Sequence, residues 1–71
     1  MKTFKPGDLL IVPKQFMLTR HPGHDYLHYT TQKHLALVLA TFVPKASYYE
    51  WACILIDGYH AWVMSDYMES L

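Results

Sequence analysis

The sequence predicts a small all-β domain that closes into a barrel, and three observations lead to this expectation. Residues 51–71 contain two apolar runs joined by Asp57-Gly58, a dipeptide typical of tight hairpins because Gly58 supplies positive φ without a steric penalty. Turn residues recur about every ten positions. The 52% hydrophobic content, with six Tyr, three Phe and two Trp, provides apolar surface for one core in 71 residues.

The first strand is predicted over Leu9–Val12, directly after a turn at residues 6–8. Proline cannot donate a ladder hydrogen bond, so Pro13 should place this strand at a sheet edge or bend it there. Residues 16–18 are expected to resume the strand after the bend.

Residues 19–33 show no sustained period and contain Pro22-Gly23. They predict a long loop with a turn of helix near residues 25–28. A long loop in so small a domain is an expected place for a binding surface.

Two further strands are predicted at residues 34–42 and 48–56, and both are apolar on both faces. In the first, one face should carry Ala36, Val38, Ala40 and Phe42, and the other Leu35, Leu37, Leu39 and Thr41. A helix over residues 34–43 is the competing interpretation. Because a barrel strand is normally polar outside, we expect the loop or another chain to cover the outer face, through self-association or a larger complex.

After the Asp57-Gly58 hairpin, Ser65-Asp66 predicts a single 3₁₀ turn, since its side-chain oxygens can accept from free backbone N–H groups. A short fifth strand should follow at residues 68–71. Trp51 and Trp62 lie among apolar residues and are expected in the core.

The charge balance disfavours some functions. Six basic and six acidic residues give zero formal net charge, whereas phosphate-binding proteins usually carry a positive excess.

The one cysteine, Cys53, cannot form an internal disulfide and should pack as a small hydrophobe. We expect no signal peptide and no membrane span, because residues 1–6 are polar and the apolar run at residues 35–43 is too short.

Two motifs resemble a known family. Residues 3–12, TFKPGDLLIV, resemble the FKxGDxLxV strand of SH3 domains and SH3-like barrels, and residues 62–68, WVMSDYM, resemble their closing (aromatic)(V/I)PSNY(V) segment. The interval from Gly58 to Trp62 is similar to the distal hairpin of that fold. The resemblance implies one SH3-like barrel over residues 1–71, with about five strands and a long loop after the first.

The departures from that family bear on function. An ALYDY-type opening strand is absent and Met64 replaces the proline of the closing motif, so a proline-rich ligand is not expected. The layout is more similar to small uncharacterised proteins of tailed bacteriophages, including cyanophages. That similarity implies a virion accessory, structural or host-directed role, located in the virion or the host cytoplasm.

The histidines are the candidate metal ligands. His21, His24 and His28 lie close in sequence, and His24 and His28 would share one face of a helical turn, with Asp25 able to orient a ring. Zinc sites in small folds usually include spaced cysteines, so the favoured interpretation is exposed polar residues and no bound metal or cofactor. Clustered histidines could instead sense pH.

The candidate partner-binding residues are Tyr26, Tyr29, Tyr48, Tyr59 and His28. A small barrel cannot bury every tyrosine, and tyrosine is favoured at interfaces because it is large, stiff and half polar. No serine, thiol or carboxylate set suggests catalysis, so we do not expect an enzyme.

The sequence therefore predicts a non-catalytic protein-interaction module. The alternative is a nucleic-acid-binding SH3-like module that stacks bases on aromatic side chains. Its basic patch would come from Lys2, Lys5, Lys14, Arg20, Lys33 and Lys45.

Overall fold

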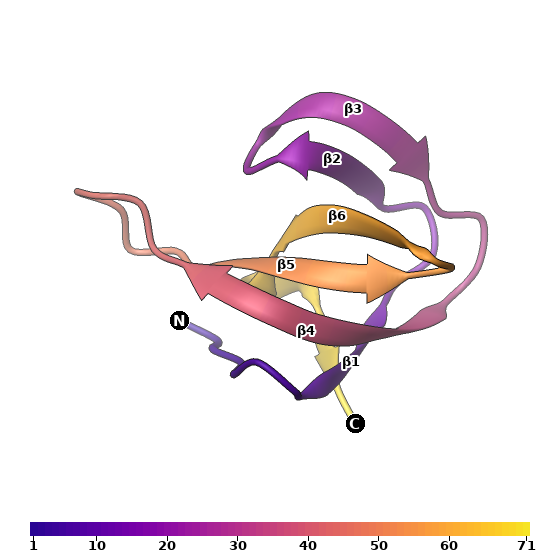
Figure 1. Ribbon diagram of the computed structural model, residues 1–71, viewed down its shortest axis with the longest axis horizontal. Helices are drawn as coiled ribbons and strands as arrows, with labels where there is room; N and C mark the ends of the chain where they lie inside the picture. The colour runs from indigo at the N-terminus through magenta and orange to yellow at the C-terminus, as the bar shows by residue number, and fades with distance from the viewer.

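The computed structural model describes residues 1–71 and is all-β, with one antiparallel sheet of seven strands (Figure 1). The strands are β1 (Leu9–Val12), β2 (Met17–His21), β3 (His24–Tyr29), β4 (His34–Phe42), β5 (Trp51–Ile56), β6 (Tyr59–Met64) and β7 (Glu69–Ser70). A 3₁₀ helix, η1 (Ser65–Tyr67), joins β6 to β7. No helix long and apolar enough to span a bilayer is present.

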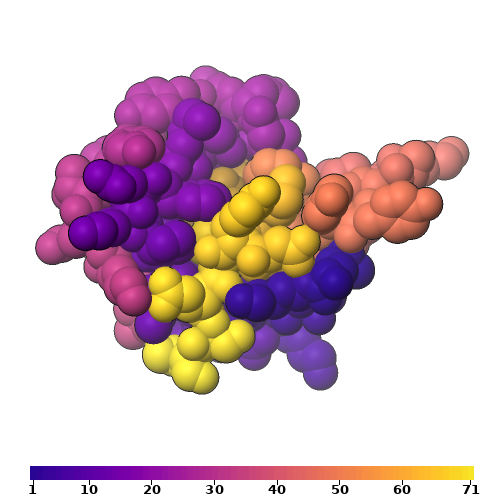
Figure 2. Space-filling view, turned by 180° about the vertical axis from the view of Figure 1, so that it is seen from behind, coloured from indigo at the N-terminus to yellow at the C-terminus, as the bar shows by residue number.

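The strand order across the sheet is β3-β2-β6-β5-β4-β1-β7. Figure 1 shows the β2–β3 hairpin above β6 and β5, and the connection between β4 and β5 projecting away from the body. Seen from behind, the yellow C-terminal segment lies between the indigo N-terminus and the purple residues of the first third of the chain (Figure 2). The curved sheet thus brings both ends of the chain together.

The prediction of a long loop at residues 19–33 was wrong. These residues form most of the β2–β3 hairpin, so the sheet has seven strands and not about five. His21 pairs with His24 across Pro22-Gly23, and Gly23 has φ of 82°. Proline followed by a glycine with positive φ is the signature of a type II turn, which the mixed polar composition on either side concealed.

The predicted hairpin at Asp57-Gly58 is confirmed. Asp57 and Gly58 both have positive φ, 49° and 81°, as a type I′ turn requires. The predicted 3₁₀ turn is also confirmed, although Ser65 does not cap it with its side chain. The Met68 N–H instead donates to the Ser65 carbonyl oxygen over 3.0 Å.

The core is mostly aliphatic. Its buried apolar residues are Phe4, Leu10, Val12, Leu18, Ala36, Val38, Ala52, Ile54, Ile56, Ala61, Val63 and Met68. Trp51 and Trp62, expected in the core, are only half-buried, because Ala52, Ile54, Ala61 and Val63 occupy the inward positions of β5 and β6.

A β-bulge changes which residues of β4 point inward. The register runs from Val38↔Ile54 to Ala40↔Cys53 and leaves Leu39 without a partner. Ala36 and Val38 are buried, whereas Ala40 and Phe42, which were predicted to share their face, are exposed. The extra residue reverses the alternation, so the predicted faces of this strand were right only in its first half.

A buried carboxylate connects the N-terminal segment to η1. Glu50 Oε2 accepts hydrogen bonds from the Phe4 N–H (2.9 Å) and from Ser65 Oγ (2.7 Å), while the Ser65 N–H donates to the Glu50 carbonyl oxygen (2.9 Å). Glu50 and Ser65 are both buried. These bonds satisfy polar groups that water cannot reach.

Replacing Glu50 by alanine should lower the free energy of unfolding by about 3 kcal/mol, because it leaves the buried Phe4 N–H and Ser65 hydroxyl without an acceptor. Urea titration followed by tryptophan fluorescence measures this loss. Tyr48→Ala is the control, since Tyr48 is 85% exposed and lies two residues away. Equal midpoints for the two variants would contradict the assigned role of Glu50.

Candidate ligand-binding groove

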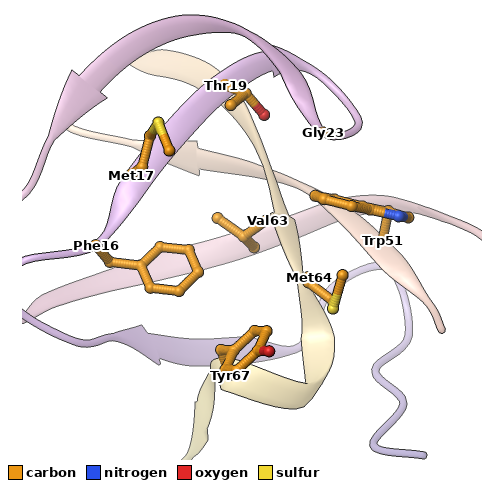
Figure 3. A pocket seen from close by; sticks show the side chains of 8 residues that line it. All are labelled: Phe16, Met17, Thr19, Gly23, Trp51, Val63, Met64 and Tyr67. Carbon is orange, nitrogen blue, oxygen red and sulfur yellow. The ribbon is translucent and has the colours of Figure 1, made fainter.

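An apolar groove of about 300 Å³ lies between the β2–β3 hairpin and η1 (Figure 3). Its lining residues come from segments far apart in sequence and are Phe16, Met17, Thr19, Gly23, Trp51, Val63, Met64 and Tyr67. Six of the eight are hydrophobic and none carries a formal charge. We call this site the groove.

Thr30 fixes the end of the groove at Phe16. Its buried hydroxyl accepts from the Phe16 N–H (2.8 Å) and donates to the Pro13 carbonyl oxygen (2.8 Å). The Thr30 N–H in turn donates to the Phe16 carbonyl oxygen over 2.9 Å. The Phe16 ring then lies 6.1 Å from the Tyr67 ring, at 46° to it. Thr30 thus binds both the N–H and the carbonyl oxygen of Phe16, and this fixed backbone orients the Phe16 side chain.

The tip of the β2–β3 hairpin forms the opposite end. A Cβ added to Gly23 would lie 3.6 Å from the Trp51 ring, so the glycine backbone packs directly on the indole. Thr19 Oγ1 holds the hairpin to its neighbours, donating to the His21 carbonyl oxygen (2.7 Å) and lying 3.3 Å from the Trp62 carbonyl oxygen. Figure 3 shows Trp51 and Met64 on one side of the groove and Phe16 and Met17 on the other.

The structure separates the predicted partner-binding residues. Tyr26 and Tyr29 are exposed and pair in register with Thr19 and Met17, so they adjoin the groove wall. Tyr48 projects from the connection between β4 and β5. His28 and Tyr59 lie elsewhere, with Leu27 and Asp57, around a second hollow of about 290 Å³.

In this second hollow, the His28 and Tyr59 rings meet edge to face with centroids 6.2 Å apart. Burial, and to a lesser degree the Asp57 carboxylate, raises the pKa of the Tyr59 hydroxyl. His34 Nδ1 lies 3.3 Å from Asp57 Oδ2, which ties the start of β4 to the β5–β6 turn. The hollow has only four lining residues.

The three histidines do not come together. His21 and His24 stack with ring centroids 5.0 Å apart, and His21 Nε2 lies 3.9 Å from Asp25 Oδ2. The predicted helical turn around His28 is wrong, because β3 is extended and its register skips Leu27. No group of three or more His, Cys, Asp or Glu side chains is placed to share a metal ion.

Two further sets of candidate residues are the single thiol and the basic residues, and the structure gives them local contacts that bear on their chemistry. Burial raises the pKa of the Cys53 thiol, which disfavours the nucleophilic thiolate. Of the six basic residues, Lys2 donates to the Met68 carbonyl oxygen (2.6 Å), Lys33 lies 3.3 Å from Glu69, and Arg20 lies 4.0 Å from Asp25. Half of the proposed basic patch thus has local partners.

Sequence reasoning missed the groove, because none of its eight lining residues was among the candidate binding residues. Phe16, Trp51 and Tyr67 were not among the candidate residues, because their convergence depends on the β2–β3 hairpin that was interpreted as a loop. The available signal was Pro22-Gly23 between two runs that each contain apolar residues. Comparison of the chain with protein-family models, curated proteins and solved structures found no match.

Alkylation of Cys53 by iodoacetamide should be slow near neutral pH and should accelerate only at a pH above the ordinary range for a thiol. The raised pKa keeps the group protonated below that point, and only the thiolate reacts. Mass spectrometry over a pH series measures the rate, with urea-unfolded protein as the control. Equal rates in folded and unfolded protein near neutral pH would contradict the effect of burial.

Proposed function

We propose that the chain is a non-catalytic protein-interaction module that binds an extended, apolar peptide segment of another protein in the groove. The observation that carries this proposal is an uncharged groove lined by three aromatic residues and two methionines. Aromatic and methionine side chains are enriched where proteins bind one another, and charged ones are depleted from interface centres.

The groove is prepared for binding before a ligand arrives. The hydrogen bonds of Thr30 hold the backbone at Phe16, and Gly23 packs against Trp51. A wall that is already ordered loses little conformational freedom on binding, which raises affinity for a given contact area. Met17 and Met64 are the adaptable parts of the wall, since a thioether side chain can fit several apolar shapes.

The finer description of the fold belongs to the same proposal. We propose that the curved sheet is an SH3-like barrel, with the β5–β6 hairpin as its distal hairpin and η1 as its closing 3₁₀ turn. The order of elements from β4 to β7 supports this assignment. Met64 stands at the position of the closing proline, and it favours a general apolar segment over a strictly proline-rich ligand.

The biological setting is proposed from the sequence resemblance alone. A virion accessory, structural or host-directed phage-type protein would act in the virion or the host cytoplasm. Mass spectrometry of purified particles and of infected-cell lysate would distinguish these two locations.

Selection of peptides about ten residues long from a display library, with proline-rich members included, tests the groove. Selected peptides should perturb the NMR signals of Trp51 and Tyr67, and Trp51→Ala should weaken binding at least about tenfold, because a buried aromatic anchor dominates such interfaces. Tyr48→Ala is the control and should bind normally. Perturbations confined to the second hollow would contradict the assignment.

Salt dependence separates the protein ligand from the alternative, a nucleic acid. Binding of a selected apolar peptide should change little as the salt concentration rises, whereas binding to phosphates through Arg20 and the lysines would weaken steeply. Fluorescence titration with the peptide and with single-stranded DNA, at low and high salt, measures both. Strong, salt-sensitive DNA binding would favour the nucleic-acid function.

A further inference from the structure

A second apolar surface lies on the outer side of β1, β4 and β5. Its residues are Leu9, Ile11, Leu35, Leu37, Leu39 and Leu55, which we call the leucine face. Five of them form two cross-strand rows, Leu9↔Leu37↔Leu55 and Ile11↔Leu35, and Leu39 lies at the bulge of β4. None of these residues lines the groove.

The leucine face is not needed for the core. Its residues alternate with Leu10, Val12, Ala36, Val38 and Ile54, which are buried on the inner side of the same strands. Leu35, Leu9 and Leu39 remain 58%, 44% and 37% exposed. An antiparallel strand with one solvated face normally alternates apolar and polar residues, so apolar residues on both sides indicate that both sides are covered.

The outer apolar surface continues beyond the leucine face. Cys53 and Trp62 form the next row, and Phe42 meets Trp62 edge to face with centroids 6.5 Å apart. The polar residues lie at the margins: His60 pairs with Leu55, and Glu69 pairs with Ile11. This distribution, with an apolar centre and polar residues at the rim, is that of a protein–protein interface.

We propose that the leucine face binds the leucine face of a second copy of this chain, giving a two-fold symmetric dimer. A symmetric interface requires that one surface be complementary to itself. A face without charged side chains meets this condition, since no like charges oppose each other when two copies meet. The zero net charge of the chain also removes long-range repulsion between copies.

The leucine face extends across much of the sheet. A specific interface takes about 800 Å² from each partner, which is about a sixth of the 4601 Å² of accessible surface. The leucine face with its Cys53–Trp62 row spans four neighbouring strands, from β1 to β6. In the proposed dimer the leucine face and this row form the apolar centre of such an interface, with the flanking polar residues as its rim.

The two edge strands of the sheet, β3 and β7, are poor alternatives for self-association. β7 has only two residues, and β3 carries a register shift and Asp25 at φ of 67°. Short, irregular or charged edge strands resist pairing with another chain. The dimer therefore forms through the face, and it is independent of any ligand in the groove.

Sedimentation equilibrium between about 1 µM and 1 mM protein tests the proposal. The wild-type chain should sediment as a dimer, and the double variant Leu35→Lys, Leu39→Lys should raise the dissociation constant at least about a hundredfold, because lysine buries an unpaired charge at the contact. The matched control, Tyr48→Lys with Tyr49→Lys, places two charges on exposed aromatic positions outside both the face and the groove and should remain dimeric.

A second measurement needs no variant. In a mixed sample of labelled and unlabelled wild-type chain, intermolecular NOEs should connect leucine methyl groups of the leucine face. A wild-type monomer over the whole range, NOEs from β3 or the groove instead, or loss of the dimer only in the control variant would overturn the proposal. A monomer whose leucine face binds a different protein would overturn it equally.

Discussion

The buried Glu50 carboxylate is the polar interaction that ties both the N-terminal segment and η1 to the start of β5. It lies at the start of β5 and accepts hydrogen bonds from Phe4 in the N-terminal segment and from Ser65 in η1. No covalent link and no long helix hold these three segments together. Together with the bonds from Lys2 to Asp66 Oδ1 and to the Met68 carbonyl oxygen (both 2.6 Å), the Glu50 carboxylate holds the N-terminal segment against η1, which carries the groove residue Tyr67.

Thr30 has a comparable role at the other end of the groove. Its side chain bridges Pro13 and Phe16, and the Gln15 N–H donates to its carbonyl oxygen over 2.8 Å. Buried polar groups with all their partners specify one arrangement better than apolar contacts, which tolerate sliding. The two buried polar centres thus place the aromatic residues, and the aliphatic core supplies most of the stability.

The sequence predicted those elements whose signals are local. The Asp57-Gly58 turn, the strands on either side of it and the 3₁₀ turn follow from residues within a few positions of one another. The bulge at Leu39 could not be predicted, because an extra residue in one strand is visible only against its partner. The groove joins residues 16–23 to residues 51–67, and their proximity is a property of the sheet order.

The sheet order also has a consequence for synthesis on the ribosome. β1 lies between β4 and β7, and Met68, at the far end of the chain, is part of the same buried core as Phe4 and Leu10. The first strand can therefore pair with β4 only after residues 34–37 have emerged, and with β7 only after residues 69–70. A topology dominated by such distant pairings folds slowly. During that interval the nascent chain exposes the apolar strands that later form the core, and exposed apolar strands favour aggregation.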